Sequence, residues 1–253
     1  SAGRKLIRAQ NHIDAIRDLV WEYTEREPST VTKQSDGSHR LNFIESPPDA
    51  ISILSGEAIY QIRSALDHLA FQLVQLNRSR ITLPLDWDEK CAFPLRVKPP
   101  RKPPIFNCFE GTLPGITTQA FTFIEGLQPY NRTDVGVYLG RLALLSNIDK
   151  HRHINVITPQ AHERMSGEVI YKGHPMNVSH VARIEDGAQV DLGPSPYSDV
   201  VEVNVSRGFH PFVSFFEPIL DPGVPAFSVD GLLQACLDRV EQFIIPAFVE
   251  FLK

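Results

Sequence analysis

Cysteine is scarce in this chain of 253 residues, and the few cysteines are not arranged as partners. The three cysteines, Cys91, Cys108 and Cys236, contain no C-x-x-C pair and are odd in number. A disulfide framework pairs its cysteines, so this pattern instead favours buried or free thiols in a reducing compartment. We therefore predict a cytoplasmic protein.

Long hydrophobic runs are missing as well. No apolar segment reaches the roughly 20 residues that a helix needs to cross a bilayer, so no membrane partner is expected. No signal peptide is visible, and the chain begins Ser1-Ala2-Gly3 instead of with methionine. This start suggests a trimmed end and leaves the natural N-terminus undefined.

A surplus of positive charge is also absent. The formal net charge is −5 and the pI is about 6.0, whereas dedicated nucleic-acid binders are usually basic. Only a local basic patch would then be available for RNA. The sequence has no phosphate-cradling glycine loop, no G-x-S-x-G elbow and no H-E-x-x-H pair, so we expect no nucleotide and no other cofactor.

What the chain does contain is a set of strong helical patterns. Apolar residues recur at helical spacing in four long stretches, residues 3–26, 47–77, 133–150 and 230–252. This spacing predicts about four long helices. Asp134 is expected to cap the third of them by accepting hydrogen bonds from the free amides of its first turn.

Between residues 154 and 218 the pattern becomes β-branched and alternating, which is typical of antiparallel strands with one wet face. A second strand signal lies near the N-terminus, where Asp36-Gly37 separates two short extended runs and predicts a hairpin. We predict a single α+β domain over residues 1–253. In it, 3–153 and 228–253 form a helical bundle, and an antiparallel β-sheet is inserted before the C-terminal helix.

The second predicted helix carries the segment RSALDH, residues 63–68. At about 100° per residue Arg63 and Asp67 share one flank, so an i,i+4 ion pair is expected. His68 lies about 140° from Arg63 on another polar flank. The two could border one cleft only if a neighbouring helix or subunit fills the gap. Otherwise the segment is an ion pair beside a solvated histidine.

A second candidate is the segment NIDKHRH, residues 147–153, at the end of the third helix. Helical register points Asp149 toward the core, where a carboxylate is costly unless it is paired. We expect Asp149 to join this helix to the second one through Arg63 or His68, either as a structural clasp or as an active site. His151 and Arg152 are also candidates, although cations suit the negative end of any helix.

A metal site is an alternative for the same segment. Asp149, His151 and His153 alternate, and His68 could add a fourth ligand. Alternation brings ligands together on a strand, however, and this stretch still ends a helix. We therefore expect no metal here.

Two resemblances emerge at these residues. The motifs RSALDHL at 63–69, FPL at 93–95, LQPY at 127–130 and DKHR at 149–152 resemble a family of uncharacterised bacterial proteins over roughly residues 50–155. That resemblance implies no activity. Arg63 and His68 also fit the R-x4-H pattern of HEPN domains, although here the pattern lies on the second long helix and not on a late one.

The HEPN resemblance implies a helical bundle, often a homodimer, in which the arginine and histidine line a cleft. Many such domains are metal-independent ribonucleases in defence or toxin systems. In that case His68 would act as general acid or base on a ribose hydroxyl, Arg63 would stabilise the phosphate, and Asp67 would orient Arg63.

Three functions therefore stay open from the sequence, and so does the question of whether the protein is an enzyme. The first is a HEPN-like ribonuclease or RNA-binding protein. The second is a non-enzymatic binding or interaction protein with an Arg-His-Asp clasp. The third is a metallohydrolase. The candidate site residues are Arg63, Asp67, His68, Asp149, His151 and Arg152.

Overall fold

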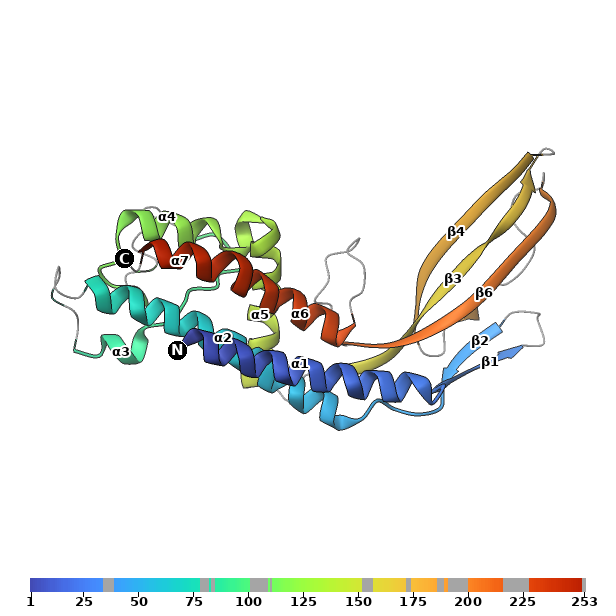
Figure 1. The fold of residues 1–253 in the computed structure, drawn as a ribbon, viewed down its shortest axis with the longest axis horizontal. Helices are drawn as coiled ribbons and strands as arrows, with labels where there is room; N and C mark the ends of the chain where they lie inside the picture. Colours follow the sequence, from blue (N-terminus) through green and yellow to red (C-terminus); the bar gives the residue numbers. More distant parts are fainter. Residues whose placement is uncertain are drawn as a thin grey trace. The chain divides into compact units, whose positions relative to one another are not determined.

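Helices and antiparallel strands make up the described part of the chain in the computed structural model, which confirms the α+β composition (Figure 1). The structure describes residues 1–33, 39–77, 82, 85–100, 109, 111–151, 157–171, 174–185, 189–190, 200–215 and 228–251. The chain divides into two compact units. The first comprises Ser1–Ile16, Ser52–Asn155 and Asp230–Lys253, and the second comprises Arg17–Ile51 and Val156–Val229. The single-domain assignment stays a prediction.

The helices overlap the predicted stretches, but the count of about four long helices is not confirmed, because short helices are also present and the last predicted helix is divided. They are α1 (Ala2–Glu25), α2 (Asp49–Asn77), α3 (Trp87–Lys90), α4 (Thr118–Gly126), α5 (Asp134–His151), α6 (Val229–Arg239) and α7 (Ile245–Phe251), with a 3-10 turn η2 (Pro129–Asn131) and a π-helical turn η3 (Val240–Ile244). In the part of the chain that the structure describes, no helix has the length and apolar composition of a membrane span.

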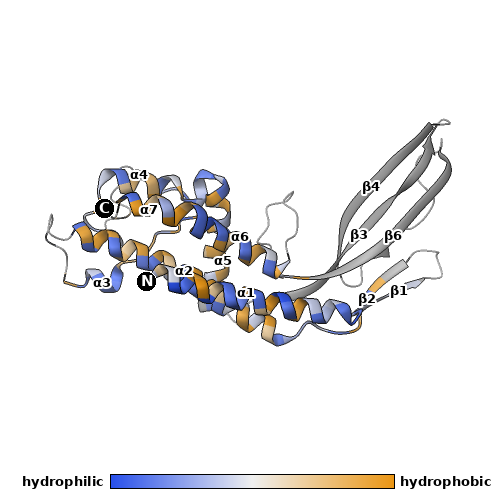
Figure 2. Cartoon of the chain, in the orientation of Figure 1, coloured by the Kyte–Doolittle hydropathy of each residue, from blue (hydrophilic) through white to orange (hydrophobic). Residues whose placement is uncertain are grey.

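The core of the first unit forms along α2. Ala58, Ile62, Leu66 and Leu73 recur at helical spacing and are at most 1% exposed, as the periodicity predicts. Hydrophobic residues follow the helices of this unit as stripes between polar faces (Figure 2). Burying such a stripe is the main driving force for packing these helices.

Polar contacts link several helices of the first unit. They are Gln10–Gln234 (α1 to α6), His12–Glu57 (α1 to α2) and Asp134–Arg239 (α5 to α6). In addition, Asp149 of α5 lies close to Gly56 of α2, so α2 has neighbours in both α1 and α5.

The start of α5 is capped by a different residue from the one predicted. The Thr133 hydroxyl accepts from the Gly136 amide at 3.0 Å, so Thr133 is the capping side chain. Asp134 instead pairs with Arg239 at 2.6 Å. The sequence offered two adjacent residues with capping chemistry, and the tertiary partner of Asp134 decides between them.

The C-terminal helical run changes its winding near Pro246. Here η3 closes i→i+5 hydrogen bonds, with the Ile245 amide donating to the Val240 carbonyl. Pro246 has no N–H to donate and its ring crowds the preceding turn, and a π-helical turn accommodates both effects. Proline therefore perturbs this helix through a π turn.

The second unit holds two antiparallel sheets. One has the order β1-β2-β5, from β1 (Ser29–Lys33), β2 (His39–Phe43) and β5 (Gln189–Val190). The other has the order β4-β3-β6, from β3 (Ile157–Tyr171), β4 (His174–Glu185) and β6 (Val200–Phe215). Strands β1 and β2 confirm the N-terminal hairpin, whose predicted Asp36-Gly37 turn lies outside the described residues.

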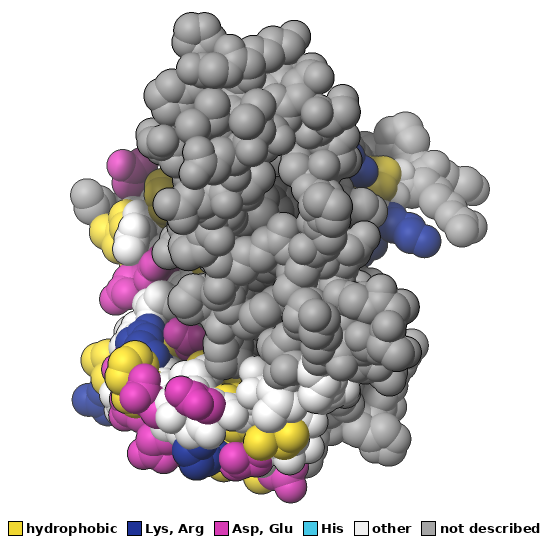
Figure 3. All heavy atoms as spheres, turned by 90° about the vertical axis from the view of Figure 1, so that its right-hand side faces the viewer, with side chains coloured by type: hydrophobic (Ala, Val, Ile, Leu, Met, Phe, Trp, Pro, Cys, Tyr) yellow, Lys and Arg dark blue, Asp and Glu magenta, His cyan; other side chains and the backbone are white. Residues whose placement is uncertain are grey.

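Acidic side chains cover part of the second unit. Figure 3 shows them in magenta toward the bottom of the face it draws, mixed with hydrophobic side chains in yellow. The exposed acidic residues of the segment 17–51 are Asp18, Glu22, Glu25, Glu27, Glu45 and Asp49. The two exposed described cations of that segment are Arg17 and Arg26, and Arg26 pairs with Glu45 at 2.7 Å. The described side chains exposed on this segment are therefore mostly acidic, which does not favour a nucleic acid.

Candidate functional site

Arg63 and Asp67 form the predicted i,i+4 pair on α2, with Arg63 Nη2 lying 3.0 Å from Asp67 Oδ1. Both side chains also bind the backbone of Phe93. The Phe93 amide donates to Asp67 Oδ1 at 2.9 Å, and Arg63 Nη2 donates to the Phe93 carbonyl. The pair thus holds both polar groups of one residue on a segment that has no regular secondary structure.

Gln128 holds the next residues of the same segment. Its side chain is fully buried and donates to the Pro94 carbonyl at 3.0 Å and to the Ile124 carbonyl at 2.9 Å. Its carbonyl oxygen accepts from the Arg96 amide at 2.9 Å. We call Arg63, Asp67 and Gln128 the clasp. Two of the motifs noted in the sequence, RSALDHL and LQPY, therefore both bind a third, FPL.

Burial sets the ionisation behaviour of the clasp. Desolvation lowers the pKa of Arg63, and the neighbouring Asp67 carboxylate partly opposes that shift. Burial, and secondarily the charge of Asp67, raises the pKa of the nearby Cys91 thiol to about 11. At neutral pH Cys91 is therefore a protonated thiol and a poor nucleophile.

His68 is not part of this arrangement. Its side chain is exposed on α2, whereas Arg63 faces a small cavity of about 140 Å³ lined by Leu95, Ala143, Ser146 and Asn147. Among the described residues, Arg63 therefore lines this cavity and His68 does not. The structure does bring Arg63 of α2 and Asn147 of α5 together, so two of the predicted polar segments do meet.

Asp149 lies against α2, as expected, but beside a different residue. A Cβ atom built on Gly56 would lie 2.6 Å from Asp149 Oδ1, so any larger residue at this position would require the carboxylate to move. Among the described residues no hydrogen bond or ion pair joins Asp149 to Arg63 or His68. His151 is the last residue of α5, and Arg152 and His153 lie outside the described residues.

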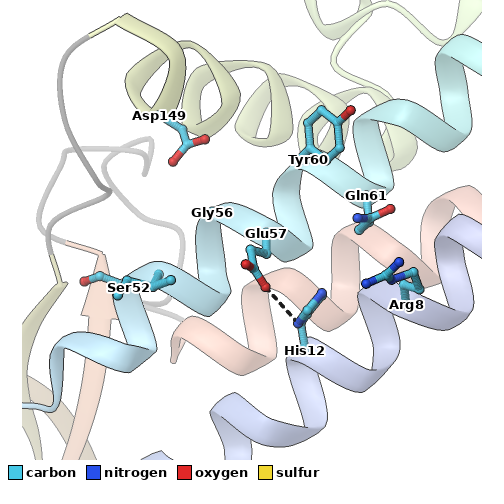
Figure 4. Close-up of a pocket in the computed structure, with 9 residues that line it drawn as sticks. Arg8, His12, Ser52, Gly56, Glu57, Tyr60, Gln61 and Asp149 are labelled. Atoms are coloured by element: carbon cyan, nitrogen blue, oxygen red, sulfur yellow. Dashed lines mark ion pairs between the residues drawn. The ribbon is translucent and has the colours of Figure 1, made fainter.

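The approach of Asp149 to Gly56 forms one end of a larger cavity, which we call the hollow. It has a volume of about 410 Å³ and lies among α1, α2 and α5. Its lining residues are Arg8, His12, Ser52, Ile53, Gly56, Glu57, Tyr60, Gln61 and Asp149 (Figure 4). That volume falls within the range of small-ligand sites, roughly 300–1,000 Å³.

Charged side chains enter the hollow from three helices. Glu57 reaches from α2 toward His12 on α1, with Glu57 Oε2 lying 3.3 Å from His12 Nδ1 (Figure 4). The imidazole is mostly buried and the carboxylate is half-exposed. Arg8 precedes His12 by four residues, about one helical turn, so both side chains extend from the same side of α1.

Tyr60 and Gln61 complete the wall formed by α2. The Tyr60 ring is 56% exposed, and Lys5 Nζ lies 5.5 Å from its centroid. The Gln61 side-chain oxygen is buried and has no hydrogen-bond partner within the described chain. A buried acceptor without a donor is uncommon in proteins.

Little in the sequence predicts this hollow. From its spacing, Arg8 is expected on the solvated face of its helix, and Glu57 and Gln61 share a polar stripe with His68. Their convergence depends on how α1 docks against α2, which periodicity does not determine. Gly56 was the one visible signal, because a glycine inside a strong helical pattern often permits a close approach.

Within the described ranges, no group of three or more His, Cys, Asp and Glu side chains is placed to hold a metal ion. His12, Glu57 and Asp149 line one hollow but do not form such a group. The predicted alternation of Asp149, His151 and His153 falls partly outside the described residues.

Comparison of the chain with family models, with curated proteins and with solved structures gave no match. The two resemblances noted in the sequence therefore stay predictions, and what this protein does has to be argued from its own geometry.

Proposed function

We propose that this protein is a binding protein that takes a small polar ligand into the hollow among α1, α2 and α5. The observation that carries the proposal is the convergence of Arg8, His12, Glu57 and Asp149 on one cavity of about 410 Å³. A concave site with a few converging polar groups is the usual form of a small-ligand site.

The clasp has a supporting role in this proposal. Arg63 and Asp67 are engaged with the Phe93 backbone, so they hold α2 to the segment that follows it. Four long helical runs, α1, α2, α5 and α6 to α7, then serve as the scaffold of the hollow. The protein thus matches the non-enzymatic alternative, although its clasp contains Arg63, Asp67 and Gln128 and not His68 or Asp149.

A ligand screen with a blocking variant tests the proposal. Thermal unfolding is followed in the presence of amino acids, sugars, nucleosides and organic acids, each at millimolar concentration. Ligands that bind the native state raise Tm. The increases should appear in the wild type, disappear in Ser52→Trp, which fills the edge of the hollow, and persist in Gln72→Trp, which carries the same substitution at an exposed site on α2.

The proposal fails if no compound raises Tm. It also fails if Ser52→Trp responds to every compound as the wild type does, because the binding site would then lie elsewhere.

A metal-independent ribonuclease is the second candidate, and the His12–Glu57 pair is the observation that favours it. A carboxylate that orients one imidazole nitrogen leaves the other nitrogen for proton transfer, and Arg8 could contact a phosphate. Two carboxylates in the same hollow oppose a polyanion, which ranks this candidate second.

Cleavage of mixed RNA in the presence of a metal chelator tests this second candidate. It also distinguishes catalysis by His12 in the hollow from catalysis by the Arg63/His68 pair. Loss of cleavage in His12→Ala but not in His68→Ala supports the hollow as the catalytic site. The opposite result supports the HEPN-like pair. That pair would need a second copy of the chain to bring a histidine to Arg63, so light scattering should then show a homodimer. Absence of cleavage in the wild type rejects the candidate.

A further inference from the structure

Two charges that line the hollow have no partner within the described part of the chain. Arg8 on α1 makes no hydrogen bond or ion pair there, and neither does Asp149 on α5. His12 Nδ1 and Glu57 Oε2, in contrast, lie 3.3 Å apart, so each of these side chains has a partner. The hollow therefore contains one spare cation, which is exposed to water, and one spare carboxylate, which is partly buried.

The two spare charges lie on different sides of the hollow. Asp149 lies on the α5 side of Gly56, whereas Arg8 and His12 lie on the α1 side (Figure 4). Gly56 adds no side chain to the space between them. Asp149 thus lies on one side of α2, and Arg8 lies on the other side together with the His12–Glu57 pair.

The sum of charges limits what can bind. Arg8 contributes one positive charge, Glu57 and Asp149 contribute two negative charges, and His12 adds a positive charge only when protonated. A phosphate dianion or a stretch of nucleic acid would bring more negative charge to walls that already carry two carboxylates. A ligand with one charge of each sign leaves the balance unchanged and can satisfy both spare groups.

We propose that the hollow binds a small zwitterion, with its ammonium group against Asp149 and its carboxylate against Arg8. This inference rests on the proposed binding function and specifies its ligand class. Charge-assisted hydrogen bonds at both ends would fix the orientation of the ligand. Ile53 and Tyr60, which are 50% and 56% exposed, would cover the methylene chain between the ends.

Matched probes test this ligand class by calorimetry. The zwitterions are the linear ω-amino acids from glycine to 6-aminohexanoate. For each length the controls are the alkylamine and the carboxylate that carry only one of the two charges. At the best length we expect the zwitterion to bind about tenfold more tightly than either control, because each control lacks one charged hydrogen bond.

Two variants assign the ends. Asp149→Asn should lower the affinity for the zwitterion and for the amine about tenfold and leave the affinity for the carboxylate unchanged. Arg8→Gln should lower the affinity for the zwitterion and for the carboxylate about tenfold and leave the affinity for the amine unchanged. Arg4→Gln and Asp18→Asn change the same charges at exposed positions of α1 outside the hollow and should bind as the wild type. Melting curves confirm that all four variants fold.

The outcomes separate this inference from the proposed function. Equal affinity for the zwitterion and for a control of the same length overturns the inference. So does zwitterion binding that is unchanged in both Asp149→Asn and Arg8→Gln. If no probe binds while screened compounds still lose their effect in Ser52→Trp, the ligand class is wrong and the hollow remains a binding site. If neither probes nor screened compounds bind, both proposals fail.

Discussion

Helix α2 carries two polar clusters about two turns apart, and they differ in how fully their charged groups are satisfied. In the clasp, Arg63 and Asp67 bind each other and both backbone groups of Phe93, while fully buried Gln128 makes three hydrogen bonds. In the hollow, Arg8 and Asp149 have no partner among the described residues. Both clusters have residue types found in active sites, but only the hollow has charges left for another molecule.

The difference shows how a charged motif should be judged. A sequence can indicate which residues are charged and which of them share a helix face, but not whether the fold already supplies their partners. A satisfied cluster contributes to stability, and an unsatisfied cluster that faces a cavity is available for binding. Substitutions in the clasp should therefore change the free energy of unfolding, whereas substitutions in the hollow should mainly change binding.

The largest effect is expected for Arg63→Ala. It removes the partner of Asp67 and the donor to the Phe93 carbonyl, so it should lower the free energy of unfolding by about 3 kcal/mol. Arg63→Lys keeps the charge without the planar donor geometry and should lose less. Urea denaturation measures both.

The matched control for this substitution is Arg4→Ala, at an exposed position on α1, which should stay within about 0.5 kcal/mol of the wild type. If Arg63→Ala loses no more than this control, the clasp does not stabilise the fold.

Cys91 provides a chemical test of burial at the clasp. With a pKa of about 11, only about one thiol in a thousand is ionised at pH 8. Alkylation of Cys91 should then be about a hundredfold slower than alkylation of free cysteine, whose pKa is near 8.5. The rate should rise about tenfold per pH unit below the pKa, since thiolate is the reactive form.

Mass spectrometry of the peptides that contain each cysteine measures these rates separately. Fully buried Cys236, whose pKa burial raises to about 12, is the internal reference and should react more slowly still. A reaction midpoint near pH 8.5 for Cys91 would show that its surroundings are open to water.

Gly56→Ala tests the close approach within the hollow. The new methyl group would lie 2.6 Å from Asp149 Oδ1, so the carboxylate must move, and stability should fall by about 1 kcal/mol. In an Asp149→Ala background the clash is gone, and alanine should instead raise stability by about 0.5–1 kcal/mol through its better helix propensity. Thermal unfolding of the wild type, the two single variants and the double variant gives the coupling energy between positions 56 and 149. If Gly56→Ala changed stability in the same direction in both backgrounds, Asp149 would not lie close to Gly56.

The smallest effect is expected for the His12–Glu57 pair. Glu57 is half-exposed, so water screens the attraction. A double-mutant cycle with His12→Gln and Glu57→Gln should give a coupling below about 0.5 kcal/mol in the free protein. A coupling energy as large as the loss of unfolding free energy in Arg63→Ala would show that the hollow stabilises the fold as much as the clasp does.

Local geometry accounts for what the sequence predicts well. The buried stripe of α2 and the Arg63–Asp67 pair follow from helical spacing alone, because the residues concerned are neighbours on one helix. The N-terminal hairpin is likewise signalled by residues close together in the chain. In these cases the sequence contains both partners within a few residues.

Long-range partners account for what it does not predict. Phe93 follows Asp67 by 26 residues, and nothing local marks it as the acceptor of Arg63. Asp149 is placed against α2 correctly by its register, but the choice of Gly56 over Arg63 depends on where α5 crosses. The sequence does not predict the hollow, because Arg8 and His12 belong to one helix and Glu57 to another, and helical spacing does not show how these helices pack together.

The π turn at Val240–Ile244 fixes how this protein can tolerate insertions and deletions. A π turn adds one residue to a helix, so deleting one residue there should restore regular α-helical winding. The run after it would then keep nearly the same orientation relative to the run before it, because a π turn uses one more residue than an α turn for about the same rotation. Phe248, fully buried against Phe93 and Phe123, would stay in that aromatic cluster. A single-residue deletion in this turn should thus be better tolerated than one elsewhere in α6 or α7, where it would rotate the residues that follow by about 100°.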